Sequence, residues 1–290
     1  MGQRVVVRHL LPGRTGPSGG PAVTDVLGVC TAWGDGTATV RRADGTVVDI
    51  PLPLIVSGKP VPPRRPVRHR VTAREAQLRA LALWPALETA ALGDWVLRWS
   101  PSDAARRANS VLAMGPPGVP DPVTRVVDHY ARLGRRPIAC VEPDGPEDEL
   151  LRSHGWDLET VQPDSLFQLG GVAAVRRTLQ ERPAYRVELE GSVGHVRAFV
   201  GELASGVASC SSDWVGLRAV ETHPDHRRRG LGLAVVAALL DWGAERGATT
   251  AYLQVTSDNA AALALYERLG FTTHHAYRYL APPGDQRAGD

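Results

Sequence analysis

The stretch Val220-Glu-Thr-His-Pro-Asp-His-Arg-Arg-Arg-Gly-Leu-Gly232 lies between an apolar run and a longer run rich in alanine and leucine. The preceding run, residues 214–220, is rich in β-branched and aromatic side chains, which is typical of a strand. The following run, residues 231–246, repeats apolar residues at the spacing of a helix. Pro224 ends the strand because proline has no N–H to donate to a sheet. The sequence therefore predicts a strand, a basic glycine loop and a helix, in that order.

Two glycines, Gly230 and Gly232, open the predicted helix. The first backbone N–H groups of a helix have no intrahelical partner and carry a partial positive charge, so a glycine loop at this end forms a cradle for an anion such as phosphate. Two common phosphate-binding motifs are excluded, because the chain has no G-x-x-x-x-G-K-[ST] and because G-x-G-x-x-G would require glycine in place of Val235. The motif that is present is R-x-x-G-x-G, with Arg227 as its basic residue.

This motif resembles the acetyl-CoA pyrophosphate loop of the Gcn5-related N-acetyltransferase (GNAT) superfamily. A second signature of that superfamily, N-x-x-A-x-x-L-Y-x-x-x-G-F, is matched by residues 259–271, which follow a predicted strand at residues 251–255. The two motifs occur in the expected order and at the expected distance within residues 185–280. The resemblance implies an α/β chain with the α+β GNAT fold and its mixed central sheet.

The resemblance also implies acetyl-CoA as cosubstrate. In the superfamily the strand before the loop diverges from its neighbour and leaves a backbone N–H free for the thioester carbonyl, and here that strand end is residues 219–222. Asn259 is expected to cap its helix, to bind the pantetheine arm, or to do both. The residues expected to bind acetyl-CoA are Val220, Thr222, Arg227, Arg228, Arg229, Gly230, Leu231, Gly232, Asn259 and Tyr266.

Two residues are expected to act in catalysis. Tyr266 matches the tyrosine that protonates the leaving sulfur in the superfamily, and a phenol with a pKa near 10 suits that role. The alternative for Tyr266 is a packing role on its helix. Glu221 is the expected general base, and the alternative is an outward-facing surface glutamate. His223, His226 and the pair His274-His275 are other candidate bases because the pKa of imidazole lies near neutrality.

Residues 4–56 contain short runs of β-branched residues separated by turn signals such as Gly34-Asp-Gly36. They predict a small all-β domain at residues 1–58. It resembles the SH3-like barrel that precedes the transferase region in some actinobacterial members of the superfamily. Four prolines at positions 57–66 predict a Pro/Arg-rich linker, which we place at residues 59–70.

Residues 71–182 are predicted to form a reduced copy of the fold expected at residues 183–290. The copy begins with a helix whose capping box is Thr72 and Glu75. It contains no R-x-x-G-x-G, so we expect it to be a degenerate GNAT-like half that does not bind CoA, as in tandem members of the superfamily. Residues 183–290 are expected to be the catalytic, acetyl-CoA-binding domain.

The join between these two halves departs from the superfamily pattern. Residues 164–182 are interpreted as a connecting segment with one helix at residues 172–181. Five residues, 190–194, then separate the strands predicted at residues 185–189 and 195–200. The superfamily places two helices after its first strand, and these helices line the acceptor pocket. The acceptor amine therefore cannot be carried over from the resemblance, and the first half is a candidate replacement for the helices.

The bulk composition is that of a soluble protein. No apolar run reaches the roughly 18 to 20 residues of a membrane helix, and the N-terminus has no signal-peptide core, so we expect a cytoplasmic location. Cys30, Cys140 and Cys210 show no metal-ligand spacing, so no metal is expected. A net charge of +2 argues against nucleic acid as a partner.

Two functions from different classes remain open. The first is an acetyl-CoA-dependent N-acetyltransferase that acts on a primary amine of a small molecule or a protein. The second is a CoA-binding regulatory protein in which the N-terminal barrel is the working module. A third, nucleic-acid binding through Arg64, Arg65, Arg68 and Arg70, lacks interleaved aromatic residues. The oligomeric state is left open.

Overall fold

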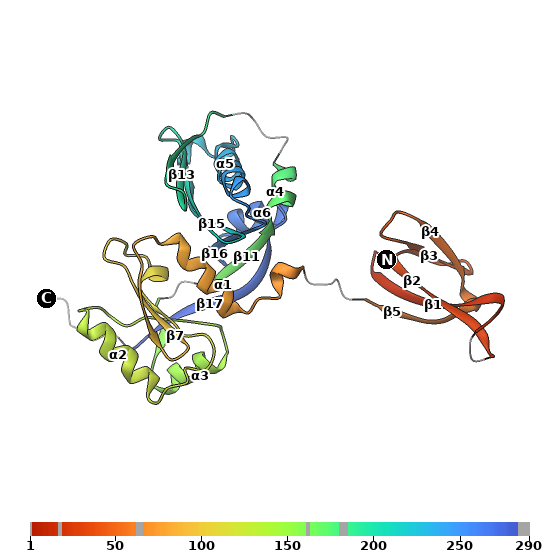
Figure 1. Ribbon diagram of the computed structural model, residues 1–290, viewed down its shortest axis with the longest axis horizontal. Coiled ribbons are helices and arrows are strands. Elements are labelled where there is room, and N and C mark those ends of the chain that lie inside the picture. The colour runs from red at the N-terminus through yellow and green to blue at the C-terminus, as the bar shows by residue number, and fades with distance from the viewer. Residues whose placement is uncertain (1, 17–18, 62–65, 161–162, 180–184, 284–290) are drawn as a thin grey trace. The chain divides into compact units, whose positions relative to one another are not determined.

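The computed structural model describes residues 2–16, 19–61, 66–160, 163–179 and 185–283. It divides the chain into two compact units, Met1–Pro66 and Val67–Asp290 (Figure 1). Each unit has a hydrophobic core of its own. Part of the predicted linker, residues 62–65, lies outside the described residues, as do Arg64 and Arg65 of the basic cluster.

The first unit is all β in its described residues, as predicted. Its elements are β1 (Arg4–Thr15), β2 (Pro21–Gly34), β3 (Thr37–Arg41), β4 (Val47–Pro51), the 3-10 helix η1 (Leu52–Leu54) and β5 (Ile55–Pro60). The strands form an antiparallel sheet in the order β4-β3-β2-β1-β5. Asp35 and Gly36 both have positive φ in the β2–β3 turn, which matches the right-handed twist of the strands. Strand β5 lies at the edge of the sheet, the position in which a strand tolerates proline.

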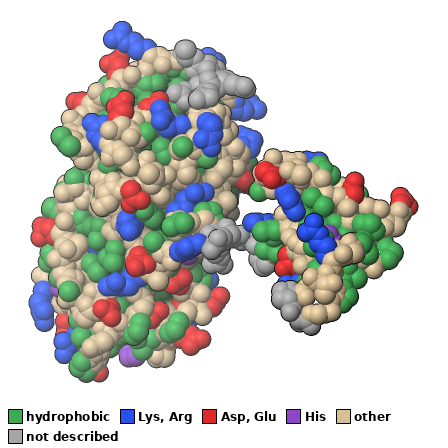
Figure 2. Space-filling model, turned by 45° about the vertical axis from the view of Figure 1, so that its right-hand side comes forward, with side chains coloured by type: hydrophobic (Ala, Val, Ile, Leu, Met, Phe, Trp, Pro, Cys, Tyr) green, Lys and Arg blue, Asp and Glu red, His purple; other side chains and the backbone are tan. Residues whose placement is uncertain are grey.

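Side chains of β2 alternate between the core and solvent, because successive side chains of a strand point to opposite faces. Val26 and Cys30 are buried in the core, whereas Val23, Leu27 and Val29 are exposed. Figure 2 accordingly shows hydrophobic side chains among the charged ones on the visible surface of this unit.

The described residues of the second unit form one large mixed sheet with helices on its faces (Figure 1). The strands are β6 (Glu88–Leu92), β7 (Trp95–Trp99), β8 (Val111–Leu112), β9 (Ala139–Val141), β10 (Asp157–Leu158), β11 (Ser165–Gly171), β12 (Glu188–Gly191), β13 (His195–Val200), β14 (Ala204–Ser211), β15 (Trp214–Thr222), β16 (Thr250–Thr256) and β17 (Thr272–Ala281). The α-helices are α1 (Ala73–Arg79), α2 (Pro122–Arg132), α3 (Pro146–Ser153), α4 (Val172–Thr178), α5 (Leu231–Glu245) and α6 (Ala260–Arg268). The 3-10 helices are η2 (Val67–His69), η3 (Ala80–Leu83), η4 (Arg106–Ala108) and η5 (Pro224–His226).

The strand order is β12-β13-β14-β15-β16-β11-β17-β9-β8-β7-β6, with β10 beside β17. Two neighbouring pairs, β15–β16 and β8–β9, are parallel, and in each pair a helix joins the strands, α5 in the first and α2 in the second. Parallel neighbours require such a crossover. The predicted mixed α/β architecture is therefore confirmed, and its strand–helix–strand unit occurs twice.

Residues 71–182 and residues 183–290 share the strands of this sheet. β11 lies in the first of these ranges, yet it pairs with both β16 and β17 of the second. β17 pairs with β11 along residues 272–277 and with β9 along residues 278–280, so it passes from one part of the unit to the other (Figure 1). The prediction of a connecting segment at β11 was wrong. Phe167 and Leu169 are completely buried on one face and Gln168 is buried on the other, and a strand covered on both faces lacks the polar alternation that marks a strand in sequence.

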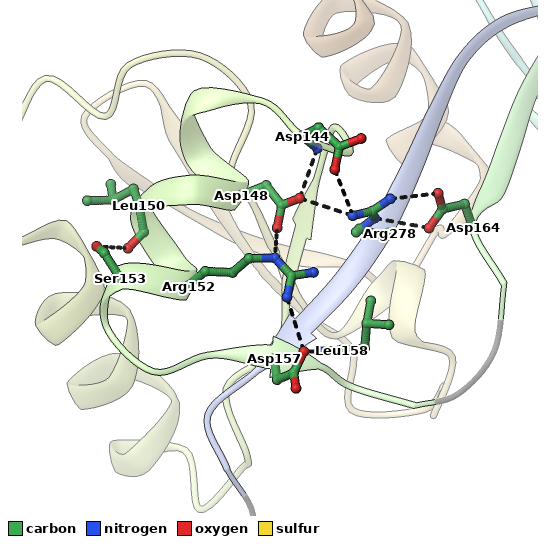
Figure 3. Close-up of polar contacts among 9 residues, drawn as sticks. All are labelled: Asp144, Asp148, Leu150, Arg152, Ser153, Asp157, Leu158, Asp164 and Arg278. Carbon is green, nitrogen blue, oxygen red and sulfur yellow. Dashed lines mark hydrogen bonds and ion pairs between the residues drawn. The ribbon is translucent and has the colours of Figure 1, made fainter.

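Arg278 of β17 holds this strand against residues 144–164 through charged contacts (Figure 3). Its guanidinium lies 3.0 Å from a carboxylate oxygen of Asp164 and 3.2 Å from one of Asp148. Asp148, on α3, is almost completely buried and also pairs with Arg152 at 2.8 Å. Because a buried carboxylate needs charged or hydrogen-bonding partners, Arg278 fixes β17 beside α3.

Residues of α1 and η3 cover the sheet face opposite α5. The predicted capping box is confirmed, because the Thr72 hydroxyl accepts from the Glu75 N–H at 3.1 Å and the Glu75 carboxylate accepts from the Thr72 N–H at 2.7 Å. α1 and η3 follow, and they pack with Trp214 and Tyr252, whereas α5 packs with the alternate residues of the same strands. The connection predicted at residues 190–194 is short as expected but is confined to residues 192–194, because β12 ends at Gly191 and β13 begins at His195.

Candidate functional site

Strand β15 separates from β16 near its carboxyl end. The paired residues run from Trp214–Thr250 to Leu217–Leu253, while β15 continues to Thr222 and β16 to Thr256. The separation predicted for this strand end is therefore confirmed. Its local cause is a β-bulge, because the register with β14 shifts at residues 205–207 and Ala219 has a positive φ of 49°.

Gly206 of β14 lies opposite this bulge. A Cβ at Gly206 would come within 2.9 Å of Val235 Cγ1 and 3.3 Å of Val220 Cγ2. Only glycine lets the bulged strand and α5 approach so closely. The bulge thus directs the backbone of residues 219–222 away from the sheet.

The loop after β15 leads into an uncapped helix N-terminus. Gly230, the residue before α5, has a φ of 85°, and the first intrahelical bond runs from the Ala234 N–H to the Gly230 carbonyl at 3.0 Å. The N–H groups of residues 231–233 precede that bond, and within the described ranges no side chain caps this helix end. A Cβ at Gly232 would lie 3.1 Å from Thr222 Oγ1, so glycine keeps the approach to these N–H groups open.

A cleft of about 900 Å³ lies beside this helix end. It brings together seven of the residues predicted from the sequence, namely Val220, Glu221, Thr222, His223, Arg227, Arg228 and Asn259. Arg229 and Gly230 lie in the loop, where the Arg229 carbonyl accepts a 2.7 Å hydrogen bond from the Tyr185 hydroxyl. The Leu231 side chain is buried in the core, so Leu231 can offer a ligand only its backbone N–H.

Helix α6 forms another wall of the cleft. Asn259 caps this helix, because its Oδ1 accepts from the Ala262 N–H at 3.1 Å, and it also lines the cleft. Tyr266 is 9% exposed, and its ring packs edge-on against Phe271 with centroids 5.7 Å apart. Burial raises the pKa of Tyr266, so the hydroxyl stays protonated at neutral pH, the state that a general acid requires.

The candidate bases lie in different places. Glu221 is exposed, lines the cleft and pairs in register with Ser205. His223 also lines the cleft, and its Nδ1 accepts from the Asp225 N–H at 3.4 Å. The ring of His226 lies edge-on to His223, and its buried Nδ1 has no partner among the residues that the structure describes.

The pair His274-His275 lies on β17, which β11 separates from β16. The Nδ1 atoms of the two rings are 2.8 Å apart, and His275 Nε2 is 3.1 Å from Gln77 Nε2. Burial, with a smaller effect from His274, lowers the pKa of His275 to about 3. This pair is packed under α1 and does not belong to the cleft wall, so its place in the fold does not support the hypothesis that it removes the proton.

A second cavity, of about 200 Å³, adjoins the same strand end and was missed by sequence reasoning. Its walls come from two distant parts of the chain: Leu83, Trp84 and Arg107 from residues 71–182, and Leu217, Arg218, Ala219 and Gln254 from residues 183–290. These residues are far apart in sequence and form no motif. Only the packing of η3 and η4 against β15 and β16 brings them together.

Three further observations concern the described part of the chain. Its helices include none long and apolar enough to cross a membrane. Its His, Cys, Asp and Glu side chains form no group of three or more suited to a metal ion. Figure 2 shows acidic and basic side chains interspersed over the visible face of the second unit.

Comparison with known proteins gives matches over both units. Residues 1–59 match the family model "Rv0428c N-terminal Sm-like domain", and residues 176–280 match "Probable histone acetyltransferase Rv0428c C-terminal". The probable histone acetyltransferase Rv0428c of Mycobacterium tuberculosis is 30% identical over 301 aligned positions, which cover 97% of this chain and 95% of that protein. The uncharacterized N-acetyltransferase YobR of Bacillus subtilis is 25% identical and is matched over 97% of its length by 71% of this chain.

A solved structure shows the same fold. The GCN5-related N-acetyltransferase from Kribbella flavida superposes with a TM-score of 0.59 at 18% identity, over 75% of this chain and 97% of that one. The fold of the second unit is therefore that of a GNAT protein. The Sm-like description of the first unit is close to the SH3-like barrel that the sequence predicted.

Proposed function

The chain belongs to the acetyltransferase family of the probable histone acetyltransferase Rv0428c, and from this membership we propose that it transfers an acetyl group from acetyl-CoA to a primary amine. As a member of that family it is an N-acetyltransferase of the GNAT type. The cosubstrate, the acceptor and the residue roles are the parts that we propose.

The observation that carries the proposal is the parting of β15 from β16 beside the uncapped start of α5. Backbone N–H groups at residues 231–233 suit a pyrophosphate, because a helix start favours negative charge. Arg227 and Arg228 line the cleft next to these groups and add positive charge. The complete set proposed to bind acetyl-CoA is Val220, Thr222, Arg227, Arg228, Arg229, Gly230, Leu231, Gly232, Asn259 and Tyr266.

The chemistry requires three actions from this site. The amine lone pair forms a bond to the thioester carbonyl carbon while the carbon–sulfur bond breaks, and a free backbone N–H of the strand end, residues 219–222, polarises the carbonyl oxygen. We assign the proton that the amine loses to the Glu221 carboxylate. We assign the proton that the sulfur gains to the Tyr266 hydroxyl, which burial keeps protonated. Holding both substrates in line supplies much of the rate.

The test combines binding with turnover. Acetyl-CoA at 100 times its dissociation constant should stabilise the protein by about 2.7 kcal/mol, seen as a higher melting temperature. Gly232→Asp should abolish this shift, because a carboxylate would occupy the place meant for phosphate. Gly194→Asp, in the exposed β12–β13 turn, is the matched control and should keep the shift.

An amine panel with thiol release as the signal then tests transfer. An unchanged melting temperature in saturating acetyl-CoA would contradict the assignment of acetyl-CoA as the cosubstrate. Binding without thiol release for any amine would instead favour the CoA-binding regulatory function.

A further inference from the structure

We propose that the cavity of about 200 Å³ is the acceptor subsite and that it selects a small molecule carrying a carboxylate in addition to the amine that is acetylated. This inference rests on the proposed acetyl transfer and names the class of its acceptor.

The cavity and the acetyl-CoA cleft meet on strand β15. Residues 217–219 line the cavity, and residues 220–222 line the cleft. The change from one to the other falls at the bulge residue Ala219, where β15 has left β16. An amine held in the cavity therefore faces a thioester held in the cleft, through the opening between the two strands.

Arg107 places a positive charge at the wall of the cavity. Its hydrogen-bond partners are uncharged. Its Nε donates to the Tyr277 hydroxyl at 2.7 Å and to Gln254 Oε1 at 3.1 Å. Burial raises the pKa of Tyr277, so this hydroxyl is uncharged at neutral pH. The two terminal nitrogens of Arg107 make no hydrogen bond or ion pair with the described residues. A partly buried guanidinium in this state favours an anion, and a carboxylate matches its paired N–H groups.

Arg218 adds a second positive charge to the same cavity. Its Nε donates to the Leu83 carbonyl at 3.1 Å, and its guanidinium lies 4.5 Å from the centre of the Trp84 ring. Its Nη1 is 3.8 Å from Asp103 Oδ2, a long ion pair between partly exposed side chains. In the described residues, Asp103 is the one carboxylate within ion-pair distance of either arginine, so the cavity retains excess positive charge.

The volume of the cavity limits the size of the acceptor. Pockets for drug-sized ligands are roughly 300–1,000 Å³, so about 200 Å³ suits a smaller molecule or group. Trp84 and Leu83 offer apolar contact for its carbon skeleton. A free amino acid combines the required features: a primary amine, a carboxylate and a short skeleton. In the transfer the acetyl group moves from sulfur to the amine nitrogen, which loses a proton, and CoA leaves as the thiol.

The test uses matched pairs of acceptors that differ only in charge. Free amino acids and their carboxamides are compared by kcat/KM in thiol release, with the full chain and saturating acetyl-CoA. For at least one pair we expect the carboxylate member to be preferred at least tenfold by the wild type. Arg107→Gln should bring that ratio close to one and leave the KM for acetyl-CoA unchanged. Arg125→Gln, at an exposed position of α2, is the control and should keep the wild-type ratio.

Arg107→Gln also removes the contacts to Gln254 and Tyr277, so each variant is checked by its melting temperature. If Arg107→Gln does not fold, Arg218→Gln takes its place, and the same ratio of kcat/KM for carboxylate over carboxamide should fall towards one. Three results would overturn the proposal. The wild type could show no preference for the carboxylate member of any pair, it could prefer a blocked lysine peptide to every free amino acid, or it could acetylate no member of the panel. If acetyl-CoA still raises the melting temperature in those cases, only the acceptor proposal fails. If acetyl-CoA does not raise the melting temperature, the cosubstrate proposal fails as well.

Discussion

Acid should destabilise the second unit through His275. The ring of this residue is buried against Phe167, with centroids 4.9 Å apart, and its Nε2 lies beside Gln77. Burial lowers its pKa to about 3 in the folded protein, whereas an unfolded histidine titrates near 6.5. Between these pKa values the unfolded chain binds a proton at His275 that the folded chain does not bind. The free energy of unfolding therefore falls as pH falls from about 6.5 towards 3.

The size of the effect follows from the two pKa values. Each pH unit between them removes about 1.4 kcal/mol, so at pH 4.5 the loss due to His275 is about 3 kcal/mol. Above pH 6.5 the residue is neutral in both states and its contribution no longer changes. His274 lies in contact and would add repulsion if it became charged, which acts in the same direction.

Urea unfolding at pH 7.0 and pH 4.5 tests this value in the wild type and in His275→Gln. The variant should lose about 3 kcal/mol less than the wild type between the two pH values. His154→Gln, at an exposed position, controls for the loss of a histidine as such. If the wild type and His275→Gln lose the same free energy, the ring is protonated in the folded state and the reasoning fails.

Three further substitutions test the site and the fold. Tyr266→Phe should lower kcat about 10²- to 10⁴-fold with little change in the KM for acetyl-CoA. If kcat stays near normal while the chemical step is rate-limiting, Tyr266 has only a packing role. Gly216→Ala should cost about 1–3 kcal/mol in chemical denaturation, because its Cβ would lie 2.2 Å from the Tyr252 ring; an unchanged midpoint would contradict this. Thr72→Ala should cost about 1 kcal/mol through loss of the capping box with Glu75, and thermal melting indistinguishable from the wild type would refute it.

Local signals in the sequence predicted the parts of the molecule that local physics determines. The glycine loop, the capping box at Thr72 and the hairpin at Asp35-Gly36 each depend on neighbouring residues, and all three are present. Strand β11 was missed because its strand character comes from neighbours about 80 or more residues away. The cavity with Arg107 and Arg218 was missed for the same reason, since no local pattern connects η4 to β15.

The exchange of β11 and β17 has a consequence for synthesis on the ribosome. Strand β9 can pair with β8 early in translation, but it receives its second neighbour, β17, only when residues 278–280 emerge. Until then the nascent chain carries an open sheet edge, which is prone to pair with other chains. Vectorial folding can complete the N-terminal unit at once, whereas the transferase unit must wait for its last strand.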